Sequence, residues 1–223
     1  MNYICDENEL EKFKESIKKF IDGDFEVRAM NPIDGLRVID KIKELEKLKG
    51  VNTKNCKLNL SSWKFNVYGD LDLTYMNFSE IPLEFGHVTG NFICYRNKLT
   101  SLKNCPDTID GDFNCSFNKL SSLEYGPKNV GGEYNCGYNE LTSLFGVPEI
   151  IKGKFNCVGN QLTSLKDLPK EILGDLACGN NPLKDLKNIN CHIHGDFICH
   201  NCKNTISVIE LKNLIVDGEI SIK

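Results

Sequence analysis

A glycine recurs at one fixed interval through most of this 223-residue chain. The spacing from Gly69 to Gly90 repeats unchanged as far as Gly195, and an eighth glycine, Gly218, follows after a slightly longer turn. A fixed period of 20 to 30 residues with apolar positions in register indicates a solenoid of stacked turns. We number each turn from its glycine, which is column one. The glycines that begin the regular turns are Gly69, Gly90, Gly111, Gly132, Gly153, Gly174 and Gly195.

Two columns of each turn predict the interior of the solenoid. Residues two apart in a strand point to the same side, so columns three and five share one face. Stacking the turns at about 4.8 Å gives a parallel sheet with an aromatic column beside a cysteine column. Column three holds Leu71, Phe92, Phe113, Tyr134, Phe155, Leu176 and Phe197, and column five holds Leu73, Cys94, Cys115, Cys136, Cys157, Cys178 and Cys199.

Column eight is an asparagine in five consecutive turns, from Asn97 to Asn181. An amide both donates and accepts, so each asparagine is predicted to bond its own turn and its neighbour's where the chain leaves the strand. Leucines in columns ten and thirteen fill the rest of the core. Because prolines stand in column seventeen, as at Pro106, the return segment has little room for a helix. We therefore expect a single curved parallel β-sheet with an extended or 3₁₀ convex side.

These columns resemble the leucine-rich-repeat family, whose pattern is LxxLxLxxNxL. Phe113, Cys115 and Leu120 match its second, third and fourth leucines, with cysteine in place of the third. Asn118 matches its asparagine. The Leu-Pro segment LTSLKDLPKEI is similar to the short bacterial class used by secreted effectors, and cysteine-bearing arrays of this kind occur in bacteriophages and large DNA viruses. The asparagine column is lost at Met76 and Cys202, which flank the regular array.

The predicted organisation has four parts. Residues 1–50 form an N-terminal α-helical cap region, with helices over 6–21 and 33–49, and residues 51–68 form a degenerate first turn. Residues 69–217 form the leucine-rich-repeat-like solenoid of seven turns, and residues 218–223 form a C-terminal strand or cap. Open solenoid ends need such covers.

Charge and hydropathy narrow the partners. The net charge is −4 and the pI is about 5.7, so the chain lacks the general basic field that favours nucleic acid. No stretch approaches the roughly 18 consecutive apolar residues that a membrane span requires. The acidic start does not resemble a secretory signal. We expect a cytoplasmic protein that binds neither nucleic acid nor membrane.

The eleven cysteines fall mostly in the interior column, where a free cysteine packs as a small hydrophobe. One stretch, residues 191–202, offers thiols and imidazoles near zinc-ligand spacing. Because the repeat directs these side chains different ways, we expect no metal site there and no cofactor. The cluster considered was Cys191, His194, Cys199 and Cys202.

Two exposed columns are the candidates for binding. Column two lies on the outer, concave face of the sheet and is mildly acidic, and column seven adds aromatic and cationic side chains at the sheet edge. Clusters of Tyr, Phe and Arg are typical of binding hot spots, but neighbouring turns also stack such side chains on one another. Both interpretations stay open. The candidate residues are Tyr75, Arg96, Phe117 and Tyr138 in column seven with Asp112, Glu133 and Asp175 in column two.

No residue pattern indicates a conventional active site. The sequence predicts a non-catalytic scaffold that binds another protein, and the resemblance implies an effector-like or phage protein that engages or inhibits a host protein. A self-associating structural or assembly component is the alternative. An enzymatic interpretation needs a bound metal or a reactive thiol. The partner and the oligomeric state stay open.

Overall fold

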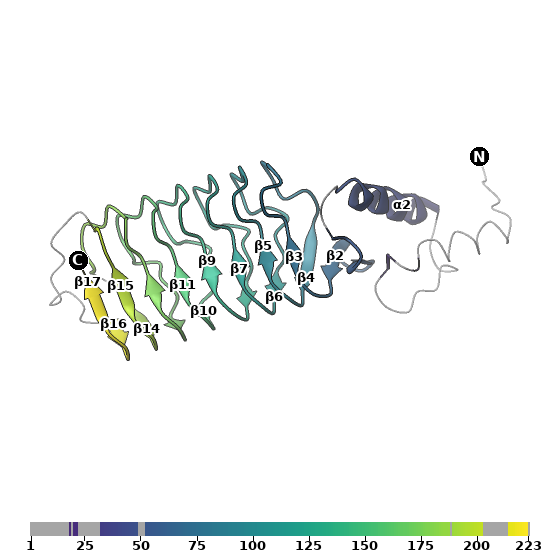
Figure 1. Ribbon diagram of the computed structural model, residues 1–223. Helices are drawn as coiled ribbons and strands as arrows, with labels where there is room; N and C mark the ends of the chain where they lie inside the picture. The colour runs from purple at the N-terminus through teal and green to yellow at the C-terminus, as the bar shows by residue number, and fades with distance from the viewer. Residues whose placement is uncertain are drawn as a thin grey trace.

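The computed structural model of the chain is a parallel β-solenoid of stacked repeats, which confirms the expected repeat-solenoid fold. Its turns stack along one axis, and helix α2 (Pro32–Glu46) lies at the N-terminal end (Figure 1). The structure describes residues 18, 20–21, 32–48, 52–187, 189–202 and 214–222. The helix expected over 6–21 falls almost wholly outside these residues, whereas the one expected over 33–49 corresponds to α2.

The main sheet follows the column glycines and contains eight parallel strands. Each strand pairs with the same columns of the next turn, as Phe113 does with Tyr134. This register keeps column three of every turn on the inner face. The strands are β3 (Leu71–Asp72), β5 (Phe92–Ile93), β7 (Phe113–Asn114), β9 (Tyr134–Asn135), β11 (Phe155–Asn156), β13 (Leu176–Ala177), β15 (Phe197–Cys199) and β17 (Ile220–Ile222).

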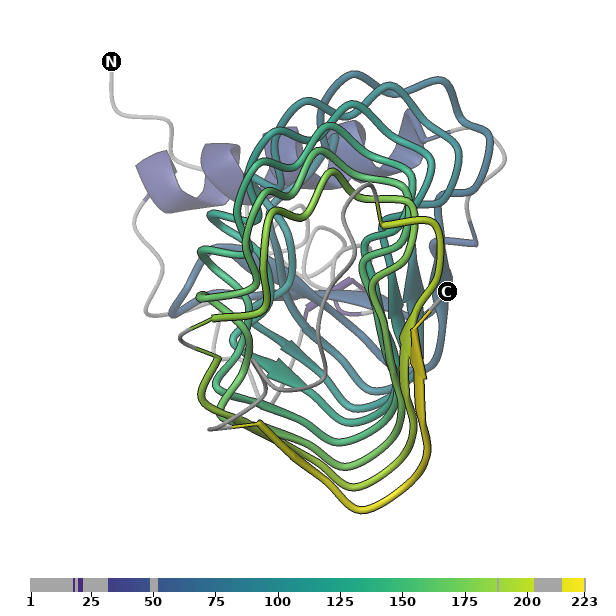
Figure 2. The same cartoon turned by 90° about the vertical axis from the view of Figure 1, so that its left-hand side faces the viewer.

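The residues just before each glycine also pair, so the expectation of a single sheet was wrong. Extended return segments carry backbone groups that need partners, and the next turn supplies them. The pairing runs in two blocks, β1-β2-β4-β6-β8 and β10-β12-β14-β16, along one side of the solenoid (Figure 2). The strands are β1 (Cys56–Asn59), β2 (Lys64–Val67), β4 (Phe85–Val88), β6 (Thr108–Ile109), β8 (Asn129–Val130), β10 (Ile150–Ile151), β12 (Glu171–Ile172), β14 (Cys191–Ile193) and β16 (Leu214–Val216).

The repeated glycine occupies the corner between the main sheet and this second sheet. The N–H of Gly132 donates to the carbonyl of Gly111 at 3.0 Å, and the same contact with the preceding column glycine is made by Gly90, Gly111, Gly174, Gly195 and Gly218. A Cβ on Gly153 would lie 2.7 Å from the carbonyl carbon of Gly132. Because backbones approach this closely at the corner, only glycine fits column one.

The core fills the interior that the two sheets and the leucine-bearing segments enclose. All column-three and column-five side chains from Leu71 to Cys199 are buried, and so are column twenty and the leucine columns. The rings of Phe113 and Tyr134 lie 4.9 Å apart, centroid to centroid, and those of Phe92 and Phe113 lie 5.8 Å apart. The aromatic column is therefore continuous through the middle of the array.

Column eight joins successive turns through its amides, as predicted. The Nδ2 group of Asn139 donates to the carbonyls of Cys136 in its own turn and Cys115 in the preceding turn, each at 3.1 Å. Its Oδ1 accepts the N–H of Leu120 at 3.0 Å. Asn97, Asn118, Asn160 and Asn181 repeat this arrangement, so five asparagines form a ladder through the interior.

The N-terminal end of the solenoid departs from a degenerate turn. Strands β1 and β2 form an antiparallel hairpin, whose turn is held by Asn59 Oδ1 accepting the N–H groups of Ser61 and Ser62. Helix α2 buries Val38, Ile42 and Leu45, which lie on one helical face. The Arg37 guanidinium lies 4.0 Å from the centroid of the Trp63 ring, so it connects α2 to the hairpin.

Replacing Asn139 with alanine leaves the N–H of Leu120 without its buried partner and removes one of the two amide donors to the Cys115 carbonyl. We expect Asn139→Ala to lower the free energy of unfolding by about 1–3 kcal/mol, because an orphaned buried group costs about that much. Denaturant unfolding measures this change. Asn190→Ala is the control, since Asn190 is exposed, and an effect no larger than that of the control would contradict the ladder.

Candidate functional site

Column seven adopts the left-handed backbone conformation in every turn of the array. The φ angles are 57° at Tyr75, 51° at Arg96, 56° at Phe117 and 53° at Tyr138. The later turns place Gly159, Asn180 and Asn201 at the same position, with φ between 54° and 70°. Their N–H groups continue the ladder between turns, as Tyr138 N–H does by donating to the Val158 carbonyl at 2.7 Å.

Bulky residues at these positions carry a backbone cost. The left-handed conformation disfavours residues other than glycine by about 1–2 kcal/mol, with asparagine among the best tolerated. The C-terminal turns use glycine and asparagine, as expected on this ground. The N-terminal turns use Tyr, Arg, Phe and Tyr instead, so packing or function must offset the cost there.

The column-seven side chains form a continuous cluster together with Tyr95 of column six. The Phe117 and Tyr138 rings stack with centroids 4.4 Å apart. Tyr95 contacts Phe117 and Tyr75 edge to face, at centroid distances of 5.4 and 5.8 Å. We call the cluster of Tyr75, Tyr95, Arg96, Phe117 and Tyr138 the aromatic edge.

Arg96 lies at the centre of the aromatic edge. Its guanidinium carbon is 5.0 Å from the ring centroid of Phe117 and 5.5 Å from that of Tyr75, which is within cation–π range. The hydroxyls of Tyr75 and Tyr95 raise the pKa of this guanidinium further. The edge therefore presents a fixed positive charge among aromatic rings.

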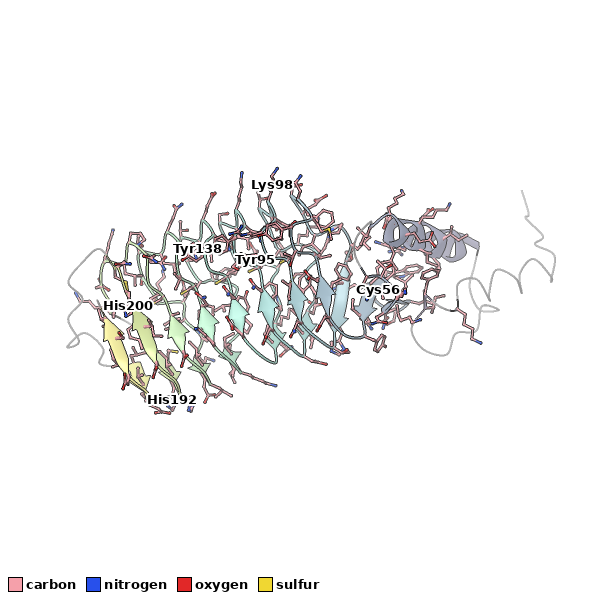
Figure 3. All side chains as sticks on the ribbon, viewed as in Figure 1. Cys56, Tyr95, Lys98, Tyr138, His192 and His200 are labelled. Atoms are coloured by element: carbon pink, nitrogen blue, oxygen red, sulfur yellow. A yellow bond between two sulfur atoms is a disulfide. The ribbon has the colours of Figure 1, made fainter. Side chains whose placement is uncertain are left out.

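The stacking does not bury the aromatic edge. Tyr75 is 63% exposed, Tyr138 46% and Phe117 38%. Both interpretations of column seven thus describe part of its geometry, since the rings stack on one another and still face solvent. The stack ends at Gly159, where a Cβ would lie 2.8 Å from the Tyr138 ring. Figure 3 shows Tyr95 and Tyr138 on the same side of the solenoid, below the exposed Lys98.

Sequence reasoning did not identify Tyr95 or the left-handed backbone. The signal for the backbone was present, because Gly159, Asn180 and Asn201 share column seven and these residue types favour that conformation. Tyr95 was missed because column six has no aromatic residue in the neighbouring turns, which carry Thr74, Ser116 and Gly137 there.

Column two has a hydrogen-bonding role that its charge did not suggest. Asp112 Oδ1 accepts the N–H of Glu133 at 2.7 Å, and Asp175 Oδ1 accepts the N–H of Asp196 at 3.0 Å. Asn91 does the same for Asp112 at 2.8 Å. The aspartates and the asparagine of column two therefore bond successive turns from the outside, whereas Glu133 accepts a hydrogen bond from Asn135 Nδ2 in its own turn. Their role in binding a partner stays a prediction.

The interior cysteines are poor nucleophiles. Burial raises the pKa of the Cys157 thiol to about 12 and raises that of Cys115 well above its usual value. Thiols without appreciable thiolate at neutral pH react slowly. The cysteine column is thus chemically quiet, which agrees with a packing role.

The zinc-like stretch is divided between the two sheets. Cys191 is buried in β14, whereas His194 is half-buried and lies beside the carboxylate of Glu171. Cys199 and Cys202 form a disulfide within one turn. Column eight turns back toward column five, as the asparagines show, so a cysteine in column eight meets the thiol of column five. The four residues do not converge as a metal site.

A groove lies beside β8 and β10, at the junction of the two blocks of the second sheet. The groove carries both signs of charge. Asp107, which does not line the groove, forms ion pairs with Lys64 and with the lining residue Lys128. Its lining residues are Thr108, Ile109, Asp110, Lys128, Asn129, Val130, Gly131, Glu149, Ile150 and Lys152.

Among the described residues, no helix has the length and apolar character to cross a membrane.

No protein-family model and no curated protein sequence matches the chain. Among solved structures, it is similar to the leucine-rich-repeat domain of a Shigella effector, with 15% identity and a TM-score of 0.37. That likeness covers 96% of this chain and 98% of the other. The assignment of the fold therefore rests on this chain's own repeat and strand register.

Two substitutions at Asp112 distinguish the hydrogen-bonding role of column two from its charge. Asp112→Ala removes the acceptor for Glu133 N–H and should lower the free energy of unfolding by about 1 kcal/mol. Asp112→Asn should change it by less than about 0.5 kcal/mol, because Asn91 performs the same role one turn earlier. Thermal unfolding of both variants tests this, and an equal loss in the two would contradict it.

The buried column also predicts thiol reactivity. With a maleimide reagent, the five unpaired thiols of column five (Cys94, Cys115, Cys136, Cys157 and Cys178) should label only as the protein unfolds. Peptide-resolved mass spectrometry gives the rate at each position. Rapid labelling of one of them in the folded protein would identify a reactive thiol and favour an enzymatic role.

Proposed function

We propose that this protein is a non-catalytic scaffold that binds another protein through the aromatic edge. The observation that carries the proposal is the presence of bulky, exposed side chains at left-handed backbone positions. Strained residues of this kind cluster at binding and catalytic sites. The C-terminal turns of the same chain avoid the strain with Gly159, Asn180 and Asn201.

The composition of the edge supports a protein partner. Tyrosine and arginine are enriched at the energetic centres of protein interfaces, and rigid stacked rings lose little entropy on binding. Arg96 is exposed, and its neighbours Lys98 and Lys119 are exposed as well. A complementary partner would present an apolar surface with at least one carboxylate for Arg96.

The described residues support a non-catalytic role. The interior thiols are protected, and the one Ser–His pair, His200 Nε2 with Ser221 Oγ at 2.8 Å, has no third group orienting the imidazole within the described part of the chain. A hydrolytic triad needs such a group.

The resemblance to short bacterial effector repeats adds a finer proposal, in which the partner is a host protein that this chain engages or inhibits. It rests on the repeat pattern alone. The alternative, a self-associating structural component, would use the same edge against a second copy. Light scattering that shows only monomer at high concentration argues against that alternative.

Asparagine substitutions give a test that spares the fold. In Tyr75→Asn/Phe117→Asn/Tyr138→Asn, lost stacking of about 0.5–1.5 kcal/mol per pair is offset by relief of left-handed strain. We expect stability to change by less than about 2 kcal/mol, while partner affinity falls at least about tenfold, as for a hot spot. Affinity capture with quantitative mass spectrometry, followed by titration of the captured protein, measures this loss.

Two matched controls accompany the triple variant. Tyr125 is 64% exposed and also left-handed, and Phe145 is 65% exposed, but both lie outside the aromatic edge. Tyr125→Asn and Phe145→Asn should retain every partner. If the triple variant binds as well as these controls do, the aromatic edge is not the contact surface.

A further inference from the structure

Four polar side chains gather on the outer face of the second sheet near its C-terminal end. His192 and His194 are two apart along β14 and the residue that follows it, so they project to the same side. Glu171 in β12 is the strand partner of His192, and Asp217 directly follows β16. Three neighbouring turns thus contribute to one cluster. Figure 3 shows His192 on the outer side of this sheet.

The contacts within the cluster are short. His194 Nε2 lies 2.9 Å from Glu171 Oε1, and its Nδ1 lies 3.0 Å from Asp217 Oδ2. His192 Nε2 lies 3.0 Å from the same Asp217 oxygen. The two imidazole rings stack with centroids 4.0 Å apart. Side-chain exposures of 34% to 48% leave the cluster open to an ion from solution.

We propose that Glu171, His192 and His194 form a binding site for Zn²⁺ and that Asp217 orients the imidazole of His194. One donor atom from each of the three residues lies within 4.8 Å of the other two. Zinc bonds of about 2.0–2.2 Å place tetrahedral ligands roughly 3.4 Å apart, so small side-chain rotations complete the site. Water takes the fourth position.

The donor set selects the class of ion. Two imidazoles and a carboxylate suit zinc and its first-row neighbours, whereas magnesium and calcium prefer oxygen ligands. A carboxylate that accepts the second ring N–H of a ligating histidine is a common companion of zinc sites. The contact of Asp217 with His194 Nδ1, opposite the Nε2 that faces Glu171, gives that arrangement.

The same columns near the N-terminal end do not supply enough ligands for such a site. His87 is in column nineteen, as Glu171 and His192 are, and Asp110 is in column twenty-one, as His194 is. His87 Nε2 lies 3.0 Å from Asp110 Oδ2, but this pair supplies only one imidazole and one carboxylate. Within the described residues, Glu171, His192 and His194 are the group whose donor atoms converge. Of the four residues considered as a zinc cluster from the sequence (Cys191, His194, Cys199 and Cys202), only His194 belongs to this site.

The site joins β12, β14 and β16, so an ion bound there holds three turns together. A ligand that binds only the folded state stabilises it by mass action. Zinc should therefore raise the unfolding temperature of the protein.

The test titrates the metal-free full-length protein with zinc chloride by isothermal calorimetry and follows thermal unfolding in parallel. We expect one equivalent of Zn²⁺ and a higher unfolding temperature. His194→Ala and Glu171→Gln should each weaken binding at least tenfold, and Asp217→Asn should weaken it about 10–100-fold, as for partners of ligating histidines. Circular dichroism verifies that each variant is folded.

His87→Ala is the matched control and should bind zinc as the unchanged protein does. Cobalt substitution gives a second readout, since its visible absorption should report nitrogen and oxygen ligands and disappear in His192→Ala/His194→Ala. Absence of stoichiometric binding, or binding that survives this double substitution, would overturn the proposal.

Discussion

The side-chain amide of column eight is the interaction on which the rest of this structure depends. Each turn, from one column glycine to the next, is too short for a helix that could cover its own backbone groups. One asparagine bonds carbonyls in two turns and an N–H in the preceding one, as Asn118 does with Cys94, Cys115 and Leu99. Because these groups are buried, leaving them unpaired would cost more than the thin apolar core readily offsets. The ladder thereby pairs the backbone of each turn where it leaves the main sheet, while the two sheets meet at the glycine corners.

The hydrogen bonds between turns determine which surfaces are available for binding a partner. Column two is engaged in bonding the next turn, even though its aspartates face outward. Column seven is different, because its backbone N–H completes the ladder whatever the side chain is. The side chain there is free to vary, and the chain places Tyr75, Arg96, Phe117 and Tyr138 where glycine or asparagine would suit the backbone better. The aromatic edge is thus a surface that the fold does not require.

The repeat alone predicted the solenoid, the interior columns and the bonding role of column eight, because each depends on residues at fixed spacing. The second sheet was missed, since each of its middle strands has one inward-facing residue, as Ile109 is in Thr108–Ile109, and therefore carries no alternation of apolar positions. The hairpin at β1 and β2 was missed because Asn59, Ser61 and Ser62 also fit an irregular turn. Glu171 and Asp217 did not stand out beside the histidines, because they lie in neighbouring turns and the turn that contains Asp217 is longer than the regular ones. Cross-turn contacts of this kind become visible only once the register is known.

Hydrogen exchange at the amides that donate to the asparagine ladder tests this account most directly. The N–H groups of Leu99, Leu120, Leu141 and Leu162 each bond an asparagine Oδ1 in the next turn, at 3.0 or 3.1 Å. If the ladder holds the turns together, these amides should exchange only on global unfolding, as slowly as the main-sheet amide of Cys115. Exchange at these four leucines as fast as at exposed turn residues, while the sheet amides stay protected, would contradict the central role of the asparagine ladder.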